Sequence, residues 1–274
     1  SWTNRSDATM IVWMRHSPLP LRRAFPFTIS TIALVAALAV VLVAATPGLA
    51  RKTRAAQAVS TAAQAESAAD LLVRSGREPR KILLVGDSFA QGLGLTMPQS
   101  LGQKSQAALA NRGKVSSGLN SPQFYDWEKA LTTYLDAEKP DVLLVMLGGN
   151  DAKNGRGTPQ WAQDFSAKAK RFLDIAAGHG VTVYWVGLPP MREKAYSQRA
   201  WTTNEAMRAA CGAAKSCRFI DSWDLFADAS GRFCPKKTLA GKAVSLRAKD
   251  GVHFTTAGCR LLTDRIVMAM ADPR

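Results

Sequence analysis

Three short, mainly apolar runs stand out in the chain after residue 80. They cover residues 81–85, 141–147 and 181–186, and each is followed directly by a glycine. Apolar runs of this length that end at turn residues are typical of strands buried inside a parallel sheet. Residues 218–221 form a shorter run of the same kind. The pattern therefore predicts at least four strands.

The segments between and after these runs have the spacing of amphipathic helices. In residues 161–177 the larger apolar side chains recur every three or four positions, which predicts a helix with one buried face. Residues 201–214 and 257–270 are also predicted to be helical. Because strands alternate with helices, we expect an α/β fold with a mostly parallel sheet that is covered by helices on both faces.

The longest apolar stretch lies near the N-terminus. Residues 27–45 contain no charged side chain, and basic residues flank them on both sides. Their length is close to the ~20 residues that span a bilayer, while the small residues at 48–50 suit cleavage by a signal peptidase. A buried core helix is disfavoured because the flanks are basic. We expect residues 1–50 to be a targeting segment, either a signal peptide or a membrane anchor.

Composition divides the rest of the chain into a linker and a domain. Residues 51–80 are rich in Ala, Gln and Ser and contain no aromatic residue, so they have little to bury. We expect an Ala-rich linker over residues 51–80 and a folded domain over residues 81–274. The targeting segment predicts a periplasmic or cell-surface location for this domain, with contact to the membrane only through the N-terminal segment.

The chain is strongly basic, with a formal net charge of +15. A basic surface is compatible with binding to nucleic acid or to an anionic polymer. The sequence has no zinc-finger, RNP-type or basic-zipper pattern, and a nucleic-acid binder therefore rests on charge alone. We predict no nucleic-acid partner.

Four cysteines permit disulfide bonds in an exported protein. Three pairings are open, of which Cys211 with Cys217 is the local one and would leave Cys234 with Cys259. The cysteine spacings do not resemble a zinc site, and no histidine cluster lies near them. We predict neither a metal nor another cofactor.

Three histidines limit the choice of a general base. His16 precedes the apolar segment, and His179 lies at the predicted end of a helix, where the helix dipole favours histidine. His253 lies just before the last predicted helix, and Asp250 stands three residues earlier. In a loop, this spacing allows the carboxylate to hydrogen-bond the imidazole and to stabilise the imidazolium, although an aspartate before Gly251 is also a common turn. By elimination, His253 is the best candidate for a base.

Ser88 follows the first predicted strand, at a strand-to-helix turn. A serine hydroxyl becomes a nucleophile when a base removes its proton, and backbone N–H groups at a helix start favour a developing oxyanion. Asn150 follows the second strand, where its amide can donate to the same oxyanion or belong to an ordinary turn. The backbone N–H of Gly118 is a third candidate donor. Because ligands bind at the carboxyl ends of parallel strands, we expect Ser88 and Asn150 at one edge of the sheet.

Taken together, four short blocks resemble the SGNH hydrolases, also called GDSL-type lipases and esterases. The blocks are Gly86-Asp87-Ser88, Gly118, Gly148-Gly149-Asn150-Asp151 and Asp250-Gly251-Val252-His253, in the family order over about residues 81–270. The resemblance implies a three-layer α/β/α, flavodoxin-like fold without a metal. It also implies a catalytic triad of Ser88, His253 and Asp250, and an oxyanion hole made by the Ser88 and Gly118 N–H groups and the Asn150 side chain. Phe89 departs from the usual leucine, and Gly118 lacks the longer consensus around it.

A narrower resemblance is to a proteobacterial periplasmic group catalogued as domain of unknown function 459. It rests on residues 85–93, 124–127 and 185–192. Some relatives are linked to the decoration of periplasmic glucans, which implies an acyl group on a carbohydrate as substrate. Phe124, Tyr125 and Trp127 are candidates either for stacking on sugar rings or for the core.

The sequence thus predicts a serine esterase or acyl hydrolase that acts on O-acyl groups of a periplasmic or cell-surface carbohydrate through an acyl-enzyme on Ser88. One alternative is an O-acyltransferase with the same triad, since a sugar hydroxyl in place of water would make the reaction a transfer. The other is a non-catalytic protein that retains the fold to bind a glycan.

Overall fold

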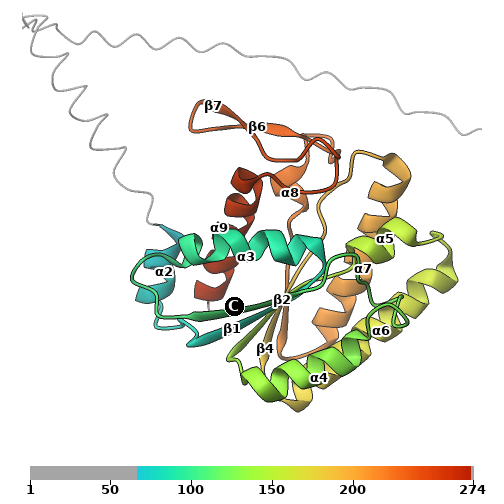
Figure 1. The fold of residues 1–274 in the computed structure, drawn as a ribbon. Helices are drawn as coiled ribbons and strands as arrows, with labels where there is room; N and C mark the ends of the chain where they lie inside the picture. Colours follow the sequence, from blue (N-terminus) through green and yellow to red (C-terminus); the bar gives the residue numbers. More distant parts are fainter. Residues whose placement is uncertain (1–66, 273–274) are drawn as a thin grey trace, which may run out of the picture. The chain divides into compact units, whose positions relative to one another are not determined.

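The computed structural model describes residues 67–272, which form an α/β domain (Figure 1). Residues 1–50, for which a targeting segment is predicted, and residues 51–66 of the predicted linker lie outside the described residues. Within residues 67–272, no helix combines the length and the apolar character that crossing a membrane requires.

The described residues contain a five-stranded parallel sheet with the strand order β2-β1-β3-β4-β5. The strands are β1 (Lys81–Gly86), β2 (Ala108–Gly113), β3 (Val142–Met146), β4 (Thr182–Val186) and β5 (Cys217–Ile220). This is the flavodoxin-like order, in which the chain changes direction across the sheet at the β1/β3 pair. All residues of β3 are buried, which explains the apolar run that predicted it.

Helices cover both faces of the sheet (Figure 1). One layer contains α2 (Ala68–Arg74), α3 (Ser88–Leu101) and α9 (Thr256–Ala271), and the other contains α4 (Trp127–Glu138), α6 (Pro159–Gly178) and α7 (Lys194–Ala213). Shorter elements are α5 (Gly149–Asn154), α8 (Trp223–Phe226) and an antiparallel hairpin of β6 (Lys236–Leu239) and β7 (Lys242–Ser245). The predicted three-layer α/β/α fold is confirmed.

Helix α2 corrects the predicted boundary between linker and domain. It lies within the predicted linker, yet it packs against α9 and buries Leu72, which is 1% exposed. Ser67 caps the helix by accepting a hydrogen bond from the Asp70 N–H. The described domain therefore begins before residue 81, because α2 packs on α9 and α3.

Of the pairings that the sequence leaves open, the structure forms only the local bond among the described cysteines. Cys211 and Cys217 form a disulfide that joins the end of α7 to β5. Cys234 and Cys259 are not bonded to each other. Cys259 is buried in α9 against Gly92 of α3, whereas the Cys234 thiol donates a hydrogen bond to the Lys236 carbonyl oxygen. The packing of α9 on α3 thus holds the Cys259 thiol inside the domain.

Candidate active site

Ser88 is the first residue of α3 and follows β1 after a single residue. The turn requires glycine at position 86, where φ is +146° and an added Cβ would lie 2.0 Å from the carbonyl oxygen of Met146 in β3. Ser88 Oγ lies 2.8 Å from His253 Nε2. This distance allows the hydroxyl proton to pass to the imidazole.

Asp250 holds the other side of the His253 ring. Its Oδ2 lies 2.7 Å from His253 Nδ1, and its Oδ1 accepts the backbone N–H groups of Val252 (2.8 Å) and His253 (3.0 Å). Partial burial acts to raise the pKa of Asp250, but the hydrogen bonds from the His253 ring and the two backbone groups outweigh it and lower the pKa to about 2. The carboxylate therefore stays ionised at neutral pH and orients the imidazole.

Arg247 supports the same loop from inside the domain, where it is only 3% exposed. Its guanidinium donates to the carbonyl oxygens of Pro190 and Val252, each at 2.6 Å, and its Nε donates to that of His253 at 3.4 Å. Three aromatic rings surround the cation at 4.9–5.6 Å: Phe226, Phe233 and Phe254. Burial lowers the pKa of Arg247 to about 10, so it remains charged at neutral pH. Sequence reasoning missed this residue, because a single arginine six positions before His253 carries no motif.

Asp87 ties the turn after β1 to the turn after β3. It is fully buried, and its two oxygens accept the backbone N–H groups of Phe89 (2.9 Å) and Gly149 (3.1 Å). Burial raises the pKa of Asp87 from 3.8 to about 7. The sequence motif includes Asp87 but predicts no role for it. In the structure, the Asp87 carboxyl group joins the two turns through its hydrogen bonds.

The predicted oxyanion donors lie together beside these turns. Asn150 Nδ2 donates to the Ser117 carbonyl oxygen at 2.9 Å, which places the amide next to the Gly118 peptide. The buried Asp151 carboxylate accepts the N–H groups of the two residues after Gly118, at 3.1 and 2.6 Å. A Cβ on Gly118 would approach this carboxylate to 2.7 Å. An amide has two hydrogens, so Asn150 keeps one for a substrate oxygen.

The other histidine that the structure describes lies away from this site. His179 caps the end of α6, at the amino-terminal edge of the sheet, and its ring contacts the Ile175 carbonyl oxygen and the Asp136 carboxylate. His16 lies outside the described residues. Among residues 67–272, no group of three or more His, Cys, Asp or Glu side chains is placed to hold a metal ion.

The three aromatic residues of the 124–127 segment divide between core and surface. Trp127 is 2% exposed and donates from Nε1 to the Ser117 hydroxyl at 2.9 Å. Tyr125 is half-buried, with its hydroxyl 2.6 Å from that of Tyr134. Phe124 faces solvent and is 55% exposed. Trp127 therefore belongs to the core, where it supports the segment that carries Gly118.

The chain is similar in sequence to a known protein family and to a known enzyme. A family model described as "Protein of unknown function (DUF459)" matches residues 81–269. Over 113 residues the chain is 30% identical to the esterase TesA of Pseudomonas aeruginosa, a match that covers 40% of this chain and 55% of that protein. The chain thus spans about half the length of this curated relative.

Two solved structures are similar in fold. LAE5, described as an alpha/beta hydrolase enzyme from the metagenome of Lake Arreo in Spain, has a TM-score of 0.54 at 15% identity, over 70% of this chain and 96% of that one. A catalytic mutant of Axe2, an acetylxylan esterase from Geobacillus stearothermophilus, has a TM-score of 0.53 at 16% identity. The match covers 70% of this chain and 94% of that one. At these identities the likeness establishes the fold, which is that of the SGNH hydrolases. In sequence, the chain is distantly similar to the esterase TesA.

Proposed function

Since this chain belongs to the family of proteins of unknown function DUF459, whose description states no activity, we propose its function from the site itself. The chain is a serine esterase or acyl hydrolase that works through an acyl-enzyme on Ser88. The observation that carries this proposal is the continuous hydrogen-bonded series from Ser88 through His253 to Asp250, with distances of 2.8 and 2.7 Å.

Acylation begins when Ser88 Oγ attacks the ester carbonyl carbon and its proton passes to His253 Nε2. The carbonyl electron pair moves onto the oxygen, and the N–H groups of Ser88 and Gly118 and the Asn150 amide stabilise the negative charge. The ionised Asp250 stabilises the imidazolium. When the carbonyl re-forms, the bond to the alcohol oxygen breaks, and His253 returns the proton to this oxygen.

Deacylation repeats the steps with water as the nucleophile. Water attacks the acyl carbon and gives a proton to His253. The bond to Ser88 Oγ then breaks, and Oγ takes the proton back. The acid is released and the free enzyme is regenerated, with no cofactor needed for the balance.

The proposed substrate is an O-acyl group on a carbohydrate. Support comes from the fold relative Axe2, which is described as an acetylxylan esterase. Further support comes from exposed aromatic side chains in the described domain, Phe124 and Trp201, because an aromatic face packs well on the apolar face of a sugar ring.

The proposed location is the periplasm or the cell surface. Residues 27–45 support this location through their unbroken apolar character. The disulfide between Cys211 and Cys217 supports it independently, because such bonds persist in oxidising compartments.

The proposal is tested by turnover of p-nitrophenyl acetate by the purified full chain. We expect Ser88→Ala and His253→Ala each to lower kcat by about a thousandfold or more. The matched control is His179→Ala, which removes a histidine outside the site and is expected to retain the wild-type rate. A wild-type rate in either Ser88→Ala or His253→Ala contradicts the proposal. Acetate release from acetylated oligosaccharides then tests the carbohydrate substrate.

A further inference from the structure

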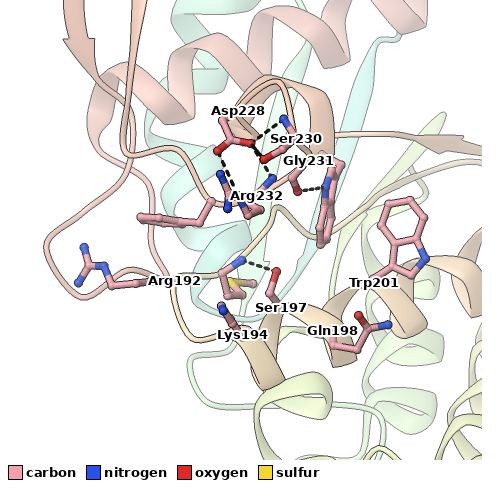
Figure 2. Close-up of a pocket in the computed structure, with 12 residues that line it drawn as sticks. Arg192, Lys194, Ser197, Gln198, Trp201, Asp228, Ser230, Gly231 and Arg232 are labelled. Carbon is pink, nitrogen blue, oxygen red and sulfur yellow. Dashed lines mark hydrogen bonds and ion pairs between the residues drawn. The ribbon is translucent and has the colours of Figure 1, made fainter.

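A cavity of about 820 Å³ lies at the carboxyl-terminal edge of the sheet, outside the triad itself (Figure 2). Its walls come from the loop after β4, the first turns of α7, α8 and the 228–233 loop. Clefts that bind small ligands occupy about 300–1,000 Å³. The cavity is therefore large enough for a ligand, and the proposed mechanism leaves it without a role.

Aromatic and amide groups line one side of the cavity. Trp201 and Trp223 form an edge-to-face pair with ring centroids 5.0 Å apart, and Trp223 is fixed by a hydrogen bond from Nε1 to the Gly231 carbonyl oxygen. Trp201 is 42% exposed, and Figure 2 shows it beside Gln198 on α7. The Gln198 side chain makes no hydrogen bond with any of the described residues. A ring face next to a free amide suits the apolar face and the hydroxyl groups of a sugar.

The cavity also has an excess of positive charge. Arg192, Lys194 and Arg232 line it, and Asp228 is the only carboxylate among its described lining residues. Asp228 accepts hydrogen bonds from the Ser230 hydroxyl (2.6 Å) and from the N–H groups of Ser230 and Arg232 (Figure 2). The hydrogen bond from the Ser230 hydroxyl is the largest cause that lowers the pKa of Asp228 to about 2. Lys194 pairs with no carboxylate among the described residues, so the cavity favours an anion.

Arg192 connects the cavity to the triad-bearing loop. Its backbone N–H donates to the Gly251 carbonyl oxygen (3.1 Å), and its guanidinium donates to that of Lys249 (2.7 Å). At Gly251, φ is +78° and a Cβ would lie 2.6 Å from Arg192 Cβ, so only glycine allows this close approach. Since Gly251 directly follows Asp250, one wall of the cavity packs against the loop that holds the triad.

The position of the cavity identifies the part of the ester that it receives. The oxyanion donors Gly118 and Asn150 follow β2 and β3, whereas the cavity follows β4 and adjoins the loop of His253. His253 gives its proton to the leaving alcohol, so the alcohol must lie on the His253 side of Ser88.

We propose that this cavity is the subsite for the alcohol part of the ester, and that it binds a sugar unit that carries an anionic group such as a carboxylate. The sugar ring packs on Trp201, and the anionic group pairs with Lys194. Arg232 is already paired, since its Nε lies 3.5 Å from Asp228 Oδ2. The assignment to the alcohol side rests on the proposed esterase function, but binding of the anionic sugar does not.

Binding is tested by calorimetric titration of the full chain with trigalacturonate and with neutral galactotriose, in a Ser88→Ala background without ester turnover. We expect trigalacturonate to bind at least fivefold more tightly. Lys194→Met removes this preference, and Trp201→Ala weakens both ligands at least fivefold. The matched control is Lys129→Met, an exposed lysine on α4, and unfolding curves verify that each variant is folded. Equal affinity for the two sugars, or affinities that neither variant changes, overturns the proposal.

Placement on the alcohol side is tested by kinetics. In wild type we expect a higher kcat/KM for acetylated trigalacturonate than for acetylated galactotriose, and Lys194→Met lowers this ratio at least fivefold. An unchanged ratio overturns the placement. Failure of the esterase proposal gives a different result: the chain then turns over no ester, including p-nitrophenyl acetate, while the titration still decides whether the cavity binds the anionic sugar.

Discussion

The guanidinium of Arg247 donates a 2.6 Å hydrogen bond to the carbonyl oxygen of Val252, the residue directly before His253. Burying a cation is costly unless hydrogen bonds or opposite charges compensate. Here backbone carbonyl groups and three aromatic rings surround the guanidinium, and among the described residues no carboxylate forms an ion pair with it. The cation thus fixes the backbone that carries His253, the proposed general base.

Replacing Arg247 tests this role. Arg247→Met leaves the Pro190 and Val252 carbonyl groups without their donor, and we expect a loss of about 2–4 kcal/mol in the free energy of unfolding. We expect kcat/KM to fall by about tenfold or more, since small displacements of a catalytic group slow the reaction. We expect Arg247→Lys to recover little of the lost stability or of kcat/KM, because one ammonium group cannot reproduce the planar set of guanidinium donors. Urea unfolding and ester turnover measure both effects.

The control for Arg247 is Arg80→Met, because the Arg80 side chain is 92% exposed. We expect Arg80→Met to change the free energy of unfolding by less than about 0.5 kcal/mol. Wild-type stability and turnover in Arg247→Met contradict the positioning role.

Asp250→Asn is expected to lower kcat by about 10²–10⁴ without unfolding the domain, because an amide does not stabilise the imidazolium. The folded pKa of Asp250, about 2, lies below its ordinary value of 3.8. Its stabilising contribution is therefore complete above about pH 4 and is lost as the pH falls toward 2. Ester turnover and acid unfolding check these expectations, with the exposed Asp224→Asn as control. Full activity in Asp250→Asn speaks against the triad.

Asp87 has the opposite pH effect, because burial raises its pKa from 3.8 to about 7. Between these two values the folded state holds a proton that the unfolded chain releases, so this carboxyl lowers the free energy of unfolding as the pH rises from about 4 to about 7. Asp87→Asn removes the titration and should flatten that slope. In Asp87→Asn an NH₂ group also replaces one of the two acceptor oxygens. One backbone N–H then loses its partner, at a cost of about 1–3 kcal/mol in the free energy of unfolding.

The slope is measured by urea unfolding at several pH values between 4 and 8. Asp164→Asn, at an exposed position on α6, serves as the matched control and is expected to retain the wild-type slope. A slope in Asp87→Asn that equals that of wild type shows that Asp87 does not titrate in this range.

Asn150→Ala tests the oxyanion hole. Loss of one preorganised donor is expected to lower kcat by about 10²–10³ with little change in KM, because the donor acts mainly on the charge that develops in the transition state. Asn154→Ala, at the end of the same short helix, is the control and is expected to leave both constants unchanged. An Asn150→Ala effect confined to KM assigns the residue to substrate binding instead.

The central part of the fold was predictable because burial leaves a pattern in the sequence. Strands β1, β3 and β4 are covered on both faces and therefore read as apolar runs. Strand β2 was missed because it lies at the edge of the sheet and has no fully buried residue. Helix α3 was not delimited, since Gly92, Gly94 and Pro98 lower its helical propensity and packing on α9 compensates.

The candidate site was predictable only where residues close in sequence form motifs. Ser88, Asn150 and His253 lie at strand ends or in a loop next to recognisable glycines, and the structure brings them to one edge of the sheet. Arg247 acts on carbonyl groups of distant segments, so no sequence spacing marks it. Trp201 and Trp223 are likewise 22 positions apart and meet only because α7 and α8 follow neighbouring strands.

Ser88 is tested as the nucleophile most directly by covalent labelling of the full chain with a fluorophosphonate, read by intact mass and peptide mapping. We expect one adduct per chain, located on Ser88, with labelling abolished in Ser88→Ala, strongly slowed in His253→Ala and unchanged in His179→Ala. A folded wild-type chain that remains unlabelled, or that carries the adduct on another residue, contradicts Ser88 as the nucleophile.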